Sequence, residues 1–176
     1  VVRGNEREVA MGEKSRGKRL GATLGVLALV LAQGAVLAGA AEVSREEWVA
    51  RVEPICKTNV LANKRIFKGA KEEVKKGELK KASTHFTRAA TAFEKTTKQI
   101  KAVPQPAADE AKIAGWLGYL NKETGFIREI GKALAAEKRH KAESISVDLN
   151  RNSTRANNAA LGFGFDYCRI DPARFG

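Results

Sequence analysis

The chain has 176 residues, of which 43% are hydrophobic and 6% aromatic, and its formal net charge is +12. Alanine, lysine and glutamate dominate the middle of the chain, a composition that excludes a sheet-based fold and favours helices. Regularly spaced apolar residues also exclude a disordered chain, although 30% of the residues are charged.

The first 41 residues have the order of regions found in a secretory signal peptide. A short basic region precedes an uncharged apolar run that starts at Leu20 and ends with the small residues 38–41. We therefore expect residues 1–41 to be an upstream extension and a signal peptide, cleaved near Ala40/Ala41, and residues 42–176 to be the exported domain. An uncleaved anchor is the alternative, because Leu20 to Ala41 is long enough to span the bilayer. In either case the domain is secreted or faces the cell envelope.

Apolar residues recurring at steps of three and four predict four helical segments, over residues 44–77, 78–103, 107–136 and 145–167. The first opens with Ser44-x-x-Glu47, a capping-box pattern, and Pro54 is expected to kink it or to reset its start. The last has the weakest pattern, because several asparagines lower its helix propensity. Short connections between four amphipathic segments predict an all-α fold, an antiparallel four-helix bundle in up-down-up-down order.

Two cysteines, Cys56 and Cys168, lie near the two ends of the exported domain. An isolated pair in an exported chain predicts a disulfide. The predicted topology agrees, since the start of the first helix and the end of the fourth lie at the same end of such a bundle. We expect one structural disulfide that closes the bundle.

The exported domain is basic in its own right, with 26 Lys and Arg and 17 Asp and Glu from Glu42 onward, a net charge of +9. Outside the membrane the acidic counterparts are anionic envelope polymers and lipid headgroups, and nucleic acid is a poorer candidate. The densest basic stretch spans the first connection between helices and is a possible anion-binding site, formed by Lys64, Arg65, Lys68, Lys71, Lys75, Lys76, Lys80 and Lys81. A solvated lysine-rich helix face is the alternative.

No group of residues indicates catalysis, a metal or a cofactor. Glu137-x-x-His140 has the spacing of a di-iron helix motif, but the second copy that such a site needs is missing and the neighbouring residues are cationic. No nucleophile, base and acid can be combined from the sequence, and no glycine-rich phosphate loop is present. We expect a protein that is not an enzyme.

Trp48, Ile55-Cys56 and the stretch Gly162-Phe-Gly-Phe-Asp-Tyr-Cys168 together resemble small exported helical proteins of bacteria that carry one cysteine near each end of the mature chain. The resemblance covers these terminal segments and the general layout. It implies an exported helical domain and no particular activity.

Two functional hypotheses follow from these features. The first is a non-catalytic module that binds an anionic envelope component or a partner protein through its basic surface. The second is a sensing or carrier bundle that holds a small apolar molecule between its helices, near Trp116, Phe126 and Phe86. A tight core with a basic end favours the first hypothesis, and an internal apolar cavity favours the second.

Overall fold

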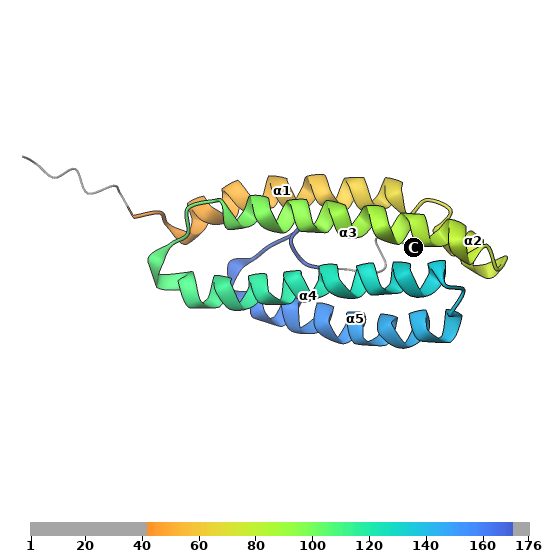
Figure 1. Cartoon of the computed structure of the whole chain (residues 1–176). Helices are drawn as coiled ribbons and strands as arrows, with labels where there is room; N and C mark the ends of the chain where they lie inside the picture. The colour runs from red at the N-terminus through yellow and green to blue at the C-terminus, as the bar shows by residue number, and fades with distance from the viewer. Residues whose placement is uncertain (1–41, 171–176) are drawn as a thin grey trace, which may run out of the picture. The chain divides into compact units, whose positions relative to one another are not determined.

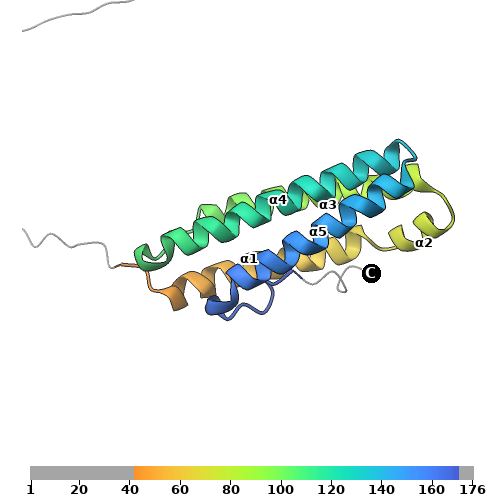
Figure 2. The ribbon, with the colours of Figure 1, turned by 90° about the horizontal axis from the view of Figure 1, so that it is seen from below.

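The computed structural model describes residues 42–170, and the expected leader lies outside them. The described residues contain only helices and loops, which confirms the all-helical fold class. The elements in chain order are α1 (Arg45–Ile66), α2 (Ala70–Lys75), α3 (Leu79–Lys101), η1 (Ala107–Asp109), α4 (Glu110–Ala135), α5 (Arg139–Ala159) and η2 (Leu161–Phe163). Figures 1 and 2 show the four long helices lying lengthwise beside one another, with α2 beyond the end of α1. None of the helices in this part of the chain has the length and hydropathy needed to cross a membrane.

Helix α1 begins as the sequence predicts and ends earlier. The Ser44 hydroxyl accepts a hydrogen bond from the backbone N–H of Glu47 at 3.1 Å, and the Glu47 carboxylate accepts one from the N–H of Ser44, which confirms the capping box. The helix does not restart at Pro54 but runs through it, and buried residues on both sides of the proline pack into one core cluster. The interruption comes instead at Gly69, whose φ of +89° suits glycine, and α2 follows as a separate helix.

Helices α3 and α4 occupy nearly the predicted ranges and pack closely on each other. Gly131 of α4 lies at their contact, and a Cβ there would stand 3.2 Å from the Phe86 Cβ and 3.4 Å from the Ser83 carbonyl oxygen. Such distances leave little room for a side chain, so the glycine permits the close approach of the two helices.

Helix α5 starts and ends earlier than the predicted segment 145–167. Its first turn overlaps the charged stretch 137–141, which contains no apolar residue and so gives no apolar pattern. The chain leaves the α-helix after Ala159, passes through η2 and turns at Gly164, which has a φ of +67°. The apolar residues beyond Ala159 that extend the sequence pattern therefore lie in the 3-10 helix η2 and in the non-helical segment after it.

The larger core cluster lies around the disulfide and is rich in aromatic rings. Trp48 of α1 and Trp116 of α4 are both 0% exposed and meet edge to face, with ring centroids 6.1 Å apart. Phe163 and Phe165 pack on the Trp48 ring at centroid distances of 5.2 and 5.7 Å. The residues that follow α5 thus complete the core at this end of the molecule.

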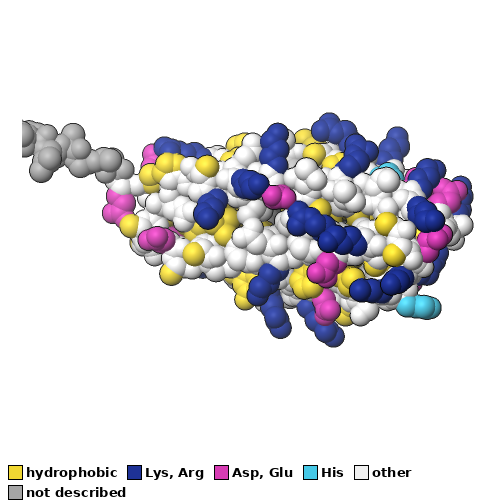
Figure 3. All heavy atoms as spheres, in the orientation of Figure 1, with side chains coloured by type: hydrophobic (Ala, Val, Ile, Leu, Met, Phe, Trp, Pro, Cys, Tyr) yellow, Lys and Arg dark blue, Asp and Glu magenta, His cyan; other side chains and the backbone are white. Residues whose placement is uncertain are grey.

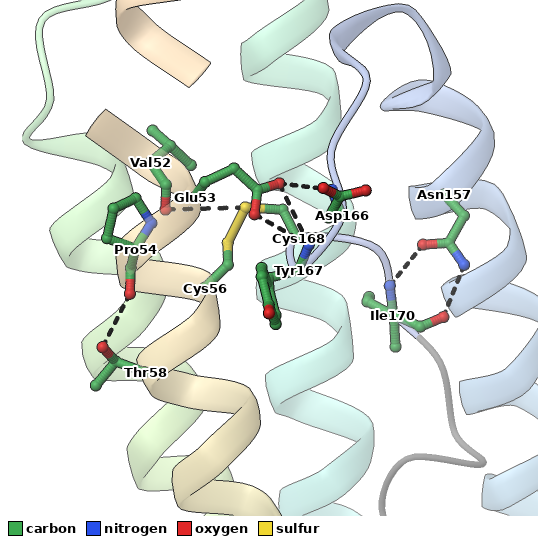
Figure 4. Close-up of a disulfide and its surroundings, with 10 residues drawn as sticks. All are labelled: Val52, Glu53, Pro54, Cys56, Thr58, Asn157, Asp166, Tyr167, Cys168 and Ile170. Carbon is green, nitrogen blue, oxygen red and sulfur yellow. Dashed lines mark hydrogen bonds between the residues drawn. A yellow bond between two sulfur atoms is a disulfide. The ribbon is translucent and has the colours of Figure 1, made fainter. Parts of the chain in front are cut away.

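Segment 164–170 is attached to α1 by a covalent bond and by hydrogen bonds (Figure 4). Cys56 and Cys168 form a disulfide with an S–S distance of 2.04 Å, which confirms the predicted pair. One turn earlier on α1, the Glu53 carboxylate accepts hydrogen bonds from the backbone N–H groups of residues 166–167, at 2.7 and 3.0 Å. The segment is not helical, and these bonds hold it against α1.

The same segment is attached to α5 by one asparagine. The Asn157 side chain donates to the carbonyl oxygen of Ile170 and accepts from its N–H, each at 2.7 Å (Figure 4). Both backbone groups of Ile170 are therefore paired, and the residue has a fixed position between α1 and α5.

Candidate functional site

An apolar groove of about 430 Å³ opens among helices α2 to α5 and the end of segment 164–170. Sites for small molecules commonly have roughly 300–1,000 Å³. Two thirds of the lining residues are hydrophobic. The lining consists of Phe67, Ala70, Lys71, Val74, Lys75, Phe86, Phe93, Glu123, Ile127, Leu149, Ser153 and Ile170. We refer to this set as the groove.

The groove lies at the end of the molecule where the short helix α2 extends beyond the end of α1. Helices α1 and α2 both pack on α3, and α5 packs on α4 on the other side. Segment 164–170 occupies space between α1 and α5 and reaches the groove with its last residue, Ile170. The apolar surfaces of α3 and α4 at the α2 end form the floor between these two walls, and Phe93 and Ile127 belong to it.

Helix α2 is held in place by His85 of α3. The His85 Nδ1 contacts the carbonyl oxygen of Ile66, the last residue of α1, and its Nε2 lies 3.0 Å from the Glu73 carboxylate on α2. Lys81 reaches the other oxygen of the same carboxylate at 3.4 Å. Because both ring nitrogens are engaged, this single side chain joins α1, α2 and α3.

Glu123 of α4 is the one acidic residue of the groove lining, and it is 2% exposed. Asn152 donates to its Oε2 at 2.7 Å, and the Ser153 hydroxyl lies 2.6 Å from its Oε1. The same hydroxyl is 2.9 Å from the carbonyl oxygen of Leu149. A hydroxyl has one proton to donate, so both Ser153 contacts are hydrogen bonds when Glu123 is protonated and donates to Ser153.

Burial raises the pKa of the Glu123 carboxyl, and the hydrogen bonds from Ser153 and Asn152 offset part of that rise. The direction agrees with the geometry, since the neutral carboxyl satisfies every contact around it.

Replacing Glu123 by glutamine should stabilise the protein increasingly as the pH rises. With a raised folded-state pKa, the contribution of Glu123 is complete below the ordinary value of 4.5 and is lost as the pH rises through the folded value. Glutamine retains the shape of the neutral acid and can donate to Ser153 while accepting from Asn152. Urea unfolding of both proteins between about pH 4 and pH 8 checks this.

Glu129→Gln is the matched control for this comparison, because it removes an exposed carboxyl from the same helix. A difference between E123Q and wild type that stays constant over the whole pH range would contradict a raised pKa of the Glu123 carboxyl.

The eight basic residues of the predicted anion site lie along the end of α1, α2 and the start of α3, and all are exposed. Three of them form ion pairs with glutamates at 2.8 to 3.4 Å, and Figure 3 shows acidic side chains among the basic ones at this end. Lys71 and Lys75 of α2 also line the groove. The predicted basic surface and the groove therefore share these two residues.

Only one of the three aromatic residues predicted to surround a ligand lines the groove, namely Phe86. Trp116 is buried in the core at the disulfide end, and Phe126 packs in the core cluster that contains Leu79 and Ile130. Ile127 lines the groove in place of its neighbour Phe126, because successive residues on a helix point in different directions.

Glu123 of the groove floor was not singled out by the sequence. In the sequence Glu123 is one of several acidic residues in a charged helix, so nothing marks it as buried. Its partners Asn152 and Ser153 lie about thirty positions further along the chain. These partners belong to the Asn- and Arg-rich stretch 151–158, which the sequence offers as a second candidate surface, since its amide groups could bond to sugars or peptides, with a solvated face as the alternative. Asn152 and Asn157 instead bond to other parts of the chain.

The groove combines mostly apolar walls with one buried carboxyl at its floor and two lysines at its rim. Family models, curated proteins and solved structures were all compared with the chain, and none matches it.

Proposed function

We propose that this protein is an exported, non-catalytic binding module that holds a small, mainly apolar molecule in the groove. The observation that carries the proposal is a volume of about 430 Å³ lined mostly by hydrophobic side chains. An apolar surface of this kind is unfavourable in water. Binding a ligand that covers it lowers the free energy of the system. Of the two functions considered from the sequence, the carrier or sensing module is the one that the groove favours.

A neutral apolar fluorophore such as Nile red should bind to the protein, and Leu149→Trp should weaken that binding by about tenfold. Leu149 is half-buried and lines the groove, so the larger indole fills space that the probe would occupy. Fluorescence titration measures the affinity, and circular dichroism shows whether the helices are retained.

Val147→Trp is the matched control, because Val147 is 50% exposed on the same helix and does not line the groove. The control should bind the fluorophore as the wild type does. Equal affinities for wild type, L149W and V147W, with all three proteins folded, would rule out the groove as the binding site.

A second candidate is binding of an anionic envelope component or a partner protein through the eight basic residues at the α2 end. Their exposure favours it, and five of them have no ion pair within residues 42–170. Electrostatic binding of this kind weakens as the salt concentration rises. Binding to anionic vesicles or wall material that disappears in high salt would support it, whereas binding of a neutral probe should depend little on salt.

For the architecture, we propose an antiparallel four-helix bundle in up-down-up-down order, formed by α1, α3, α4 and α5. Export is supported by the leader-like composition of residues 1–41, by the disulfide and by the resemblance to exported bacterial helical proteins. An intact mass that begins at Ala41 or Glu42 in the exported protein is the expected result. A full-length mass would favour a retained anchor instead.

A further inference from the structure

We infer that the ligand of the groove is a single-chain amphiphile with a carboxylate head, whose apolar tail lies in the groove and whose head binds Lys71 and Lys75. This inference rests on the proposed function and names the chemical class of its ligand. It is carried by the distribution of polar groups between the interior of the groove and its rim.

The interior of the groove has no polar group that needs a ligand. Both Glu123 oxygens have partners in Asn152 and Ser153. The buried side-chain atoms that lack a hydrogen-bond partner among the described residues belong to side chains outside the groove lining. A ligand head placed inside would lose its hydration without a protein partner in return, so the interior suits a tail and the polar head must stay at the rim.

The rim supplies positive charge from α2. Lys71 and Lys75 are separated by one helical turn and therefore lie on the same side of α2. Ala70 and Val74, each one position earlier, line the groove with their apolar side chains. One short helix thus contributes both an apolar wall and two cations at its edge, which is the arrangement that an amphiphilic anion requires.

The two lysines are available to an anion. Lys75 is paired with Glu72 at 2.8 Å, but both side chains are 61% exposed, and a surface pair of this kind contributes little. Lys71 has no ion pair among the described residues. A ligand carboxylate can bind Lys71 and replace Glu72 at Lys75, whereas a cationic head would be repelled by both.

The test compares dodecanoate with dodecanol, which have the same tail and differ in the head. Each is titrated against the protein with bound Nile red, at a pH where dodecanoate is ionised, and displacement gives the affinity. Dodecanoate should bind about tenfold more tightly than dodecanol, and the double variant K71E/K75E should abolish this preference. Dodecanol should bind equally to both proteins.

K95E/K98E is the matched control, because it makes the same change in net charge with exposed lysines of α3 that do not line the groove. It should retain the preference for dodecanoate. Equal affinities for dodecanoate and dodecanol on the wild type would overturn the inference and leave the proposed function standing. Absence of binding for Nile red and both amphiphiles would overturn the proposed function as well.

Two further arms separate other occupants. Salt-sensitive binding to anionic phospholipid vesicles that is lost in K71E/K75E, without binding of free dodecanoate, would assign the lysines to a lipid surface and overturn the inference. A chain that ends at Ile170 tests the residues that follow, since Ile170 lines the groove. Dodecanoate binding by this shortened chain alone would assign the groove to residues 171–176 and overturn the inference too.

Discussion

Replacing Cys56 and Cys168 by serine should lower the free energy of unfolding by about 4 to 5 kcal/mol, because the disulfide closes a loop with a sequence separation of 112 residues. The effect comes mainly from the unfolded chain, which gains conformational freedom when the loop opens. A loss of this size is a large part of the total stability of a small domain, which is roughly 5 to 15 kcal/mol. Urea unfolding of the two proteins provides the measurement.

Reduction supplies an internal control for the same prediction. A thiol reductant should lower the stability of the wild type to that of the double serine variant, and it should leave the variant unchanged. Blocked thiols before reduction, detected by alkylation and mass spectrometry, show that the bond is present in the purified protein. A loss of less than about 1 kcal/mol would mean that the disulfide does not constrain the unfolded chain as the loop-entropy model requires.

Replacing Trp48 by alanine should lower the free energy of unfolding by about 3 to 5 kcal/mol, as for other fully buried aromatic side chains. Trp48 is 0% exposed and contacts the rings of Trp116, Phe163 and Phe165. These rings come from α4, η2 and segment 164–170, so the cavity left by alanine would lie where three parts of the chain meet. Urea unfolding measures the loss, and near-ultraviolet circular dichroism reports on the packing of the remaining rings.

Trp48→Phe is the informative companion variant. The Trp48 Nε1 has no hydrogen-bond partner among the described residues, so phenylalanine sacrifices volume but no hydrogen bond. It should cost clearly less than alanine. Leu61→Ala, at a residue of α1 that is 49% exposed, should change stability by less than about 0.5 kcal/mol. Similar losses for W48A and W48F would show that packing around the ring does not determine the effect.

The features that were predictable from the sequence depend on neighbouring residues. The capping box needs only Ser44 and Glu47, three positions apart, and the ranges of α3 and α4 follow from the apolar period of each helix. The cysteine pair is an exception over a long distance, but two cysteines allow a single pairing. Such signals are present in the chain before any tertiary contact is known.

The groove was not predictable, because it depends on contacts between distant residues. Its floor needs Glu123 of α4 to meet Asn152 and Ser153 of α5, and each of these residues alone is an ordinary polar residue of a helix. The wall of the groove that α2 forms also requires α2 to be a helix separate from α1. Gly69 permits that break, but the sequence pattern runs through the glycine to Val74 and suggests one long helix.

The attachment of segment 164–170 also determines the order in which the molecule can be completed. The helices form through contacts between near neighbours in the chain, whereas the hydrogen bonds from residues 166–167 to Glu53 join residues more than 110 positions apart. Contacts of such high sequence separation are slow to form, because the intervening chain must first be brought together. During synthesis, Cys168 and Ile170 are also made after all five helices. The wall of the groove formed by Ile170 is therefore among the last parts of the fold to be built.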